Sequence, residues 1–210
     1  MLNPIEIIIS VMISAALTEV GSRWIDRLYL SEEAPLTFPE EISARSRYRR
    51  PFLWIGLFFC VLLSVQRSPL DAGYLIAASF FLLLITATDF EQYVIFDRMT
   101  LSFAVVGLIA AFHLQLPLVD RLTACAVGGG VFLLLVIISR GAIGGGDIKL
   151  VAALGLWFGT EKLFDIVVLG SIFGGVAALF MLLIKKADRK SVFAYGPYFA
   201  LTALYYLFNH

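Results

Sequence analysis

Apolar residues run in long blocks along this chain, and short polar segments that hold most of the charges separate the blocks. Eight blocks are candidate membrane-spanning helices, at residues 4–22, 52–67, 71–89, 99–116, 119–139, 147–159, 162–185 and 192–208. A helix needs about 20 apolar residues to cross a bilayer, and several blocks approach that length. The pattern therefore predicts an all-α polytopic membrane protein with about eight transmembrane helices in one domain, residues 1–210.

Composition agrees with a membrane protein rather than a soluble one. Hydrophobic residues make up 60% of the chain and charged residues 15%, with a mean hydropathy of +0.90, whereas about a quarter of a soluble domain is charged. The formal net charge is zero and by itself says nothing about nucleic acid; no nucleic acid partner is expected. The first apolar block has no basic residue before it and is expected to be a retained span.

The basic residues predict an orientation. The longest polar stretch is 26–51, which includes the arginine-rich run 45–50. If this stretch is a cytoplasmic loop and eight spans alternate, 13 of the 16 Lys and Arg residues lie on or near the cytoplasmic side. Only Arg67, Arg121 and Lys162 then lie outside. The positive-inside rule favours this topology, which places both termini on the outer side of the cytoplasmic (inner) membrane.

Two aspartates lie at the ends of apolar blocks that this topology brings to the same side. Asp147 follows three glycines, 144–146, and Asp89 ends an earlier block. A carboxylate that enters hydrocarbon is costly and is usually functional. At about 1.5 Å of helix per residue, Asp147 is expected about 12 Å and Asp89 about 6 Å below the cytoplasmic edge of the hydrocarbon. We therefore expect both in a cleft open to the cytoplasm.

Two neighbouring carboxylates suit peptide hydrolysis without a metal. They do not both ionise easily, so the pair holds one proton near neutral pH. The ionised member can take a proton from water while the protonated member polarises a peptide carbonyl. No serine or cysteine has a histidine at a matching depth, which argues against a nucleophilic protease. No Cys or His spacing predicts a zinc site.

Asp147, Asp89 and Lys149 could each have a purely structural role instead of a catalytic one. Asp147 could cap the helix that it begins, and Asp89 could be an interfacial acid at the end of its span. Lys149 could extend to the interface or influence Asp147.

Other features are expected to be structural. Glu91 and Asp97 lie in a predicted cytoplasmic loop and are expected to be solvated. Glu19 is expected to pair with Arg23, one helical turn later. The GxxxG pattern of residues 170–174 predicts a helix-packing surface.

Four segments together resemble the signatures of the bacterial type IV prepilin peptidases, which are GxGD intramembrane aspartic proteases. Residues 144–150 (GGGDIKL) resemble the second aspartate motif, and Asp89 with residues 97–101 (DRMTL) resembles the first. Residues 195–200 (YGPYFA) are similar to the C-terminal signature, and residues 21–22 (GS) match the end of the first helix. The resemblance covers nearly the whole chain.

The resemblance implies that Asp89 and Asp147 are the catalytic pair and that Gly144, Gly146 and Lys149 support it. It also implies cleavage of a short basic leader from prepilin or pseudopilin precursors, just after a glycine, at the cytoplasmic face of the bilayer. Many members also methylate the new N-terminal amine with S-adenosylmethionine.

The chain departs from the family pattern in the loop at residues 26–51. Typical members carry paired CxxC motifs there, thought to hold zinc, whereas this shorter loop has no cysteine and has Ser46 and Arg49 at two of the corresponding positions. No metal and no cofactor are therefore expected, with S-adenosylmethionine needed only if methyltransferase activity is retained. Phe96 stands where the family usually has a proline, at a position that is not catalytic.

Three rival functions remain open at this point. The first is a bifunctional peptidase and N-methyltransferase. The second is a non-enzymatic transporter or assembly subunit that uses the two acids for protons or cations. The third is a presenilin-like protease that cuts within substrate helices.

Overall fold

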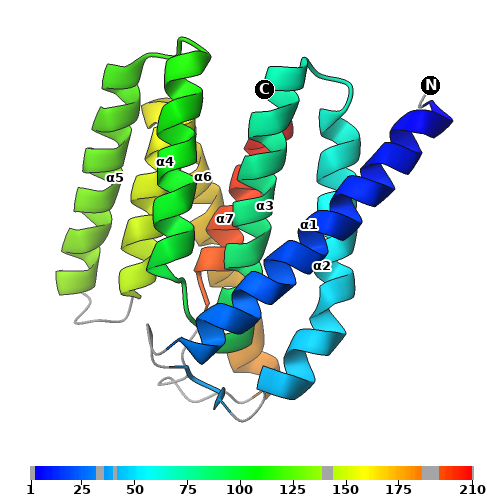
Figure 1. Cartoon of the computed structure of the whole chain (residues 1–210). Helices are drawn as coiled ribbons and strands as arrows, with labels where there is room; N and C mark the ends of the chain where they lie inside the picture. The colour runs from blue at the N-terminus through cyan, green and yellow to red at the C-terminus, as the bar shows by residue number, and fades with distance from the viewer. Residues whose placement is uncertain (1–2, 32–35, 40–41, 139–143, 186–193, 210) are drawn as a thin grey trace.

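The chain folds into a bundle of helices. The computed structural model describes residues 3–31, 36–39, 42–138, 144–185 and 194–209 (Figure 1). Within these residues the helices are α1 (Pro4–Leu30), α2 (Ile42–Ser64), α3 (Pro69–Gln92), α4 (Asp97–His113), α5 (Leu118–Ile138), α6 (Gly145–Lys185) and α7 (Gly196–Phe208). The expected all-α class is confirmed for the described residues.

Four of these helices are long and apolar enough to cross a membrane: α1, α3, α5 and the part of α6 over Gly145–Met181. Eight crossings therefore remain a prediction. Two helices extend beyond the expected spans. The first helix continues to Leu30 instead of ending at residue 22, and α2 begins at Ile42, inside the stretch expected to be a loop. Polar residues beyond the apolar core extend both helices, because backbone hydrogen bonding continues past the hydrophobic segment.

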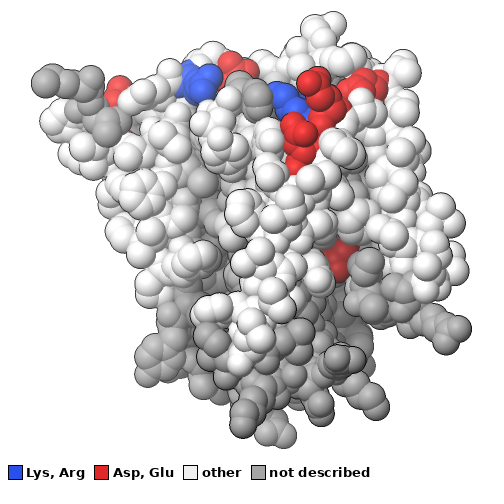
Figure 2. Space-filling model, turned by 180° about the vertical axis from the view of Figure 1, so that it is seen from behind, with Lys and Arg blue, Asp and Glu red and all other residues white. Residues whose placement is uncertain are grey.

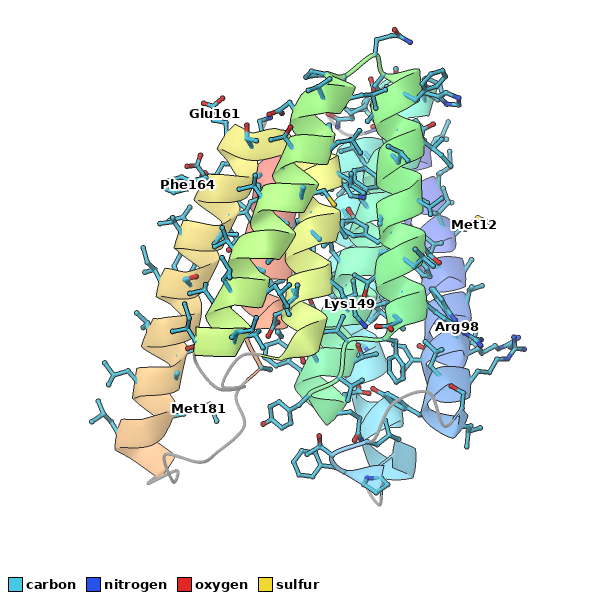
Figure 3. The ribbon with its side chains drawn as sticks, turned by 90° about the vertical axis from the view of Figure 1, so that its left-hand side faces the viewer. Met12, Arg98, Lys149, Glu161, Phe164 and Met181 are labelled. Atoms are coloured by element: carbon cyan, nitrogen blue, oxygen red, sulfur yellow. The ribbon has the colours of Figure 1, made fainter. Side chains whose placement is uncertain are left out.

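Helix α6 reverses direction at Gly159. This glycine has φ 75° and ψ −179°, which interrupts the helical backbone. A positive φ is a conformation that glycine adopts at little steric cost. Lys149 lies toward the lower end of the bundle, Glu161 lies at the upper end, and Met181 lies low again (Figure 3). The two halves of α6 therefore match the two separate spans expected at 147–159 and 162–185.

Side chains close the starts of two helices. Asn3 and Glu6 form a capping box at α1, because the Asn3 side chain accepts from Ile5 N–H at 3.1 Å and Glu6 accepts from Asn3 N–H at 3.1 Å. At α3, the Ser68 hydroxyl oxygen accepts from Asp71 N–H at 3.2 Å. Such caps satisfy N–H groups that have no partner within the helix. The expected ion pair of Arg23 with Glu19 is confirmed at 2.8 Å on the exposed face of α1.

Helix α3 lies at the centre of the bundle, where it contacts α1, α2, α4 and α7 (Figure 1). Its side chains Leu82, Leu84 and Ile85 are fully buried. The end of α3 is thereby fixed relative to four other helices, which gives any side chain there a well-defined position.

Glycines allow α6 to approach its neighbours closely. A Cβ atom on Gly170 would lie 2.5 Å from Cδ1 of Phe199, and one on Gly174 would lie 2.8 Å from Cδ1 of Tyr195. The packing surface expected at residues 170–174 is therefore confirmed, and it faces the start of α7. Small residues at such positions let transmembrane helices pack closely.

We expect Gly155→Ala to destabilise the contact between α5 and α6. A Cβ atom on Gly155 would lie 2.5 Å from the backbone nitrogen of Cys125, so one helix must shift. Overpacking of this kind costs about 1–3 kcal/mol, which thermal unfolding in detergent would measure. Gly130→Ala is the matched control, because nothing lies within 4 Å of a Cβ atom there. Equal stability of the two variants would contradict the close contact.

Candidate active site

Asp89 lies in the last turn of α3 and is only 5% exposed. The helix ends four residues later at Tyr93, which has the left-handed φ of 55° and whose N–H donates to the Asp89 carbonyl at 3.0 Å. The carboxylate oxygen Oδ2 of Asp89 is buried and has no hydrogen-bond partner among the described residues. A buried polar atom without a partner is costly and calls for an explanation, such as a functional role.

Asp147 lies in the first turn of α6 and is 7% exposed. Its N–H donates to the Gly144 carbonyl at 3.1 Å, and its carboxylate accepts from the backbone of Gly144. This second bond closes the start of the helix in the manner of a capping box. The alternative capping role of Asp147 is therefore compatible with a place in an acidic pair.

The structure brings the two acids together. The end of α3 and the start of α6 lie at the same, lower end of the bundle (Figure 1), and the carboxylates of Asp89 and Asp147 interact electrostatically. Both are buried, so water screens their interaction less than it would at the surface. The structure therefore places near each other the two residues that the sequence predicts to share a site, and their joint catalytic role stays a prediction.

A third helix completes this site. A Cβ atom on Gly196, the first residue of α7, would lie 2.6 Å from Oδ2 of Asp89, and the Gly196 backbone faces the same carboxylate. Gly196 lies in the segment at residues 195–200 that resembles the C-terminal signature, but it is not among the site residues expected from the sequence. The available signal was a glycine followed by proline at the start of an apolar block, where N–H groups are free to face an acid.

Ile95 separates the starts of α6 and α7. A Cβ atom on Gly146 would lie 2.9 Å from Cβ of Ile95, and one on Gly196 would lie 2.8 Å from its Cδ1. Ile95 belongs to the short segment between α3 and α4. The glycines beside the two aspartates therefore create the space that this side chain fills.

We expect Gly146→Ala to lower the activity of the site about tenfold, because Ile95 must move and Asp147 is the adjacent residue. A misplacement of about 1 Å can cost as much as 100-fold in rate. Gly145→Ala is the matched control: nothing lies within 4 Å of a Cβ atom there, and alanine favours the helix. Initial rates of peptide hydrolysis, the reaction that the acidic pair suits, would compare the two. A parental rate for Gly146→Ala would show that this packing is unimportant for activity.

Lys149 pairs with Asp97 across the α4–α6 contact. Its Nζ lies 2.6 Å from Oδ1 and 2.7 Å from Oδ2 of Asp97. Asp97 is exposed, as expected, but it is not simply solvated. The structure therefore gives Lys149 an acidic partner other than Asp147. An exposed pair of this kind contributes roughly 0–1 kcal/mol.

Glu91 is not solvated, so that prediction is wrong. It is 4% exposed and its Oε2 accepts from the Tyr29 hydroxyl at 2.8 Å. It lies in the last turn of α3, on a side that α1 covers, whereas the sequence placed it in a loop. Glu91 therefore connects the ends of α1 and α3 next to the candidate site.

Gln92 binds the segment at residues 36–39 to the end of α3. Its Oε1 accepts from Phe38 N–H at 2.7 Å, and its Nε2 donates to the Phe38 carbonyl at 2.9 Å. The Thr37 hydroxyl donates to the Gln92 carbonyl at 2.6 Å. This segment belongs to the stretch expected to be a cytoplasmic loop. It packs beside the end of α3 that carries Asp89. Ser46 and Arg49 have side chains outside the described residues.

The described residues contain no group of three or more His, Cys, Asp or Glu that could hold a metal ion. What the site presents instead is a buried pair of carboxylates bordered by glycines from two helix starts. Such a pair can hold one proton between its members and act as an acid and a base together.

Comparisons with known proteins point to one family. The type IV leader peptidase family matches residues 76–179, a region that includes Asp89 and Asp147. A Prepilin leader peptidase/N-methyltransferase of Xanthomonas campestris is 30% identical over 132 residues, which cover 60% of this chain and 46% of that protein. A protein of the same name from Escherichia coli is 27% identical over 194 residues, which cover 83% of each chain.

The chain spans about half the length of several of these relatives, such as the one from Pectobacterium carotovorum, of which it covers 50% at 30% identity. No solved structure matches the chain. The family match covers the region that carries both buried aspartates. Over residues 76–179, the chain therefore matches the type IV leader peptidase family.

Proposed function

We propose that this protein is an intramembrane aspartic endopeptidase that removes the basic leader from type IV prepilin or pseudopilin precursors. The observation that carries the proposal is the meeting of two buried carboxylates, Asp89 and Asp147, from separate helices. The family and the names of the relatives support a peptidase of this class. The proposed setting is the cytoplasmic membrane, with the site open to the cytoplasm and both termini on the outer side.

The proposed reaction uses the two carboxylates together. The ionised member takes a proton from a water molecule, whose oxygen attacks the carbonyl carbon of the scissile peptide bond. The protonated member donates a hydrogen bond to the carbonyl oxygen as negative charge develops there. The tetrahedral intermediate collapses when the carboxyl group that took the proton from water gives it to the leaving nitrogen, which breaks the C–N bond and returns that group to its ionised form. No covalent enzyme intermediate forms.

The position of the site suits a cut near the membrane surface. A leader rich in Lys and Arg is attracted to anionic lipid headgroups, while the following apolar helix stays in the bilayer. The scissile bond between them then lies close to the depth expected for Asp89 and Asp147. A presenilin-like activity would instead cut within the apolar helix.

Methylation of the new amine is a separate question, because the relatives' names include N-methyltransferase. A cavity of about 430 Å³ lies beside Lys149, between α4, α5 and α6. Its lining is mainly apolar, and two of its charged groups, Lys149 and Asp97, bind each other. It therefore does not fit S-adenosylmethionine, and we assign no step to this cofactor.

Cleavage of a prepilin-type precursor in reconstituted membranes tests the proposal. The parent protein is expected to yield two products with a single cut between the basic leader and the apolar helix, as measured by intact mass spectrometry. The Asp89→Asn/Asp147→Asn double variant is the inactive control. A cut deep within the apolar helix would favour the presenilin-like reading, and an added methyl group would restore the bifunctional one. Uncut precursor, with both proteins correctly inserted, would overturn the proposal and favour a transporter or assembly role.

A further inference from the structure

A cavity of about 340 Å³ lies at the end of the bundle opposite the two aspartates. Three basic residues line it: Arg67 from the α2–α3 connection, Arg121 from the start of α5, and Lys162 from α6 just after its reversal. We call this cavity the basic pocket. The three residues are the same ones that the positive-inside topology leaves on the outer side. Figure 2 shows acidic and basic side chains together along the upper edge of the molecule, with mostly uncharged residues directly below them.

The cations of the basic pocket are not neutralised by salt bridges. Among the described residues, neither Arg67 nor Lys162 lies within salt-bridge distance of a carboxylate. Arg121 is held in place by a hydrogen bond from its Nη1 to the Trp157 carbonyl. Its Nε is buried and has no acceptor among the described residues. Three cations therefore line one cavity, and the Nε of Arg121 has no acceptor among the described residues.

The nearby acids already have local partners. Asp71, the one carboxylate that lines the basic pocket, accepts from the Ser68 hydroxyl at 2.7 Å. Asp120 lies beside Arg121, but its Oδ1 accepts from the Thr160 N–H at 3.2 Å and from its hydroxyl at 2.5 Å. The charges that line the pocket are three positive and one negative, which favours an anion there.

The other walls of the basic pocket are apolar or aromatic, and they include Tyr74, Trp157 and Leu207. An arginine side chain offers a planar set of donors that matches phosphate oxygens. Basic pockets between transmembrane helices are suited to phosphate headgroups of lipids, whose acyl chains then contact apolar walls. The charge, the free donors and the apolar walls of the basic pocket therefore all favour a phosphate-bearing ligand with an apolar part.

We propose that the basic pocket binds a phosphate-bearing anion, which the headgroup of an anionic phospholipid or free phosphate could supply. The site is separate from the proposed catalytic pair, so its occupancy does not depend on peptidase activity. A bound headgroup would connect α3, α5 and α6 at the outer end of the bundle. Binding of this kind stabilises the folded protein by mass action.

Binding of phosphatidylglycerol to the purified full chain tests this proposal. Native mass spectrometry and thermal unfolding in detergent would be measured with added phosphatidylglycerol, with phosphatidylcholine and with inorganic phosphate. The parent is expected to retain phosphatidylglycerol in preference to phosphatidylcholine. The Arg67→Gln/Lys162→Gln double variant is expected to bind it about 30-fold more weakly, since each cation contributes roughly a factor of five.

The matched control is Arg23→Gln/Arg27→Gln, which removes two exposed cations from α1 and leaves the basic pocket intact. It should bind phosphatidylglycerol like the parent. If inorganic phosphate alone reproduces the stabilisation and depends on Arg67 and Lys162, the site is confirmed and its source is a soluble anion. Equal stabilisation of the pocket variant and the control by phosphatidylglycerol and by inorganic phosphate, or no response of the parent to either, would overturn the proposal.

Discussion

Replacing either Asp89 or Asp147 by asparagine is expected to lower precursor cleavage at least about 100-fold. Each substitution keeps the shape of the side chain but removes the group that exchanges a proton, and general acid–base catalysis contributes about 10²–10⁴-fold. Because the two carboxylates are proposed to act as a unit, the double variant should be little worse than either single variant. Single-turnover cleavage rates in reconstituted membranes would measure all three.

The matched control for the aspartate variants is Asp71→Asn. Asp71 is in the first turn of the same helix, α3, at the opposite end from Asp89, and its loss should leave cleavage near the parental rate. Thermal unfolding would verify that the inactive variants are folded. Parental cleavage by Asp89→Asn or by Asp147→Asn would sink the two-carboxylate mechanism, whatever the behaviour of the control.

Gly196→Ala is expected to have the second largest effect, a loss of cleavage of about 100-fold with little loss of folded protein. A Cβ atom there would lie 2.6 Å from Oδ2 of Asp89 and 2.8 Å from Cδ1 of Ile95, so the start of α7 or the carboxylate must move. Displacement of a reacting group by about 1 Å is enough for a loss of that size. Cleavage rate and thermal unfolding would be measured on the same preparation.

Two glycines provide controls for that substitution. A Cβ atom on Gly73 of α3 or on Gly175 of α6 meets nothing within 4 Å, so Gly73→Ala and Gly175→Ala should both cleave like the parent. If Gly196→Ala also retained the parental rate, α7 would not be part of the site. If it failed to fold, a smaller shift at Ile95, by Ile95→Val in the parent background, would test whether this packing controls the acids.

The sequence was sufficient to predict that Asp89 and Asp147 share a site, because the length of the apolar blocks and the distribution of basic residues determine which helix ends lie together. The sequence also indicated the reversal within α6, because the polar residues Thr160, Glu161 and Lys162 separate two apolar blocks. These features depend on the period and length of hydrophobic segments, which a single sequence records directly.

Contacts between distant segments were not predictable in the same way. Glu91 is a charged residue of the kind that usually lies in solvent. Its burial depends on a contact with Tyr29, which lies 62 residues earlier. The packing of Gly196 against Asp89 depends on how α7 meets α3, and no periodic pattern encodes that contact. The pairing of Lys149 with Asp97 likewise requires the relative position of α4 and α6.

The candidate site is assembled from three segments that are far apart along the chain: the end of α3, the start of α6 and the start of α7 (Figure 1). During synthesis, α3 and α6 enter the membrane before α7 is available. At that stage Asp89 lacks the wall that Gly196 provides, so the acids are present but not yet held in their final arrangement. Packing of α7 against α3 is therefore the step that would complete the proposed active site.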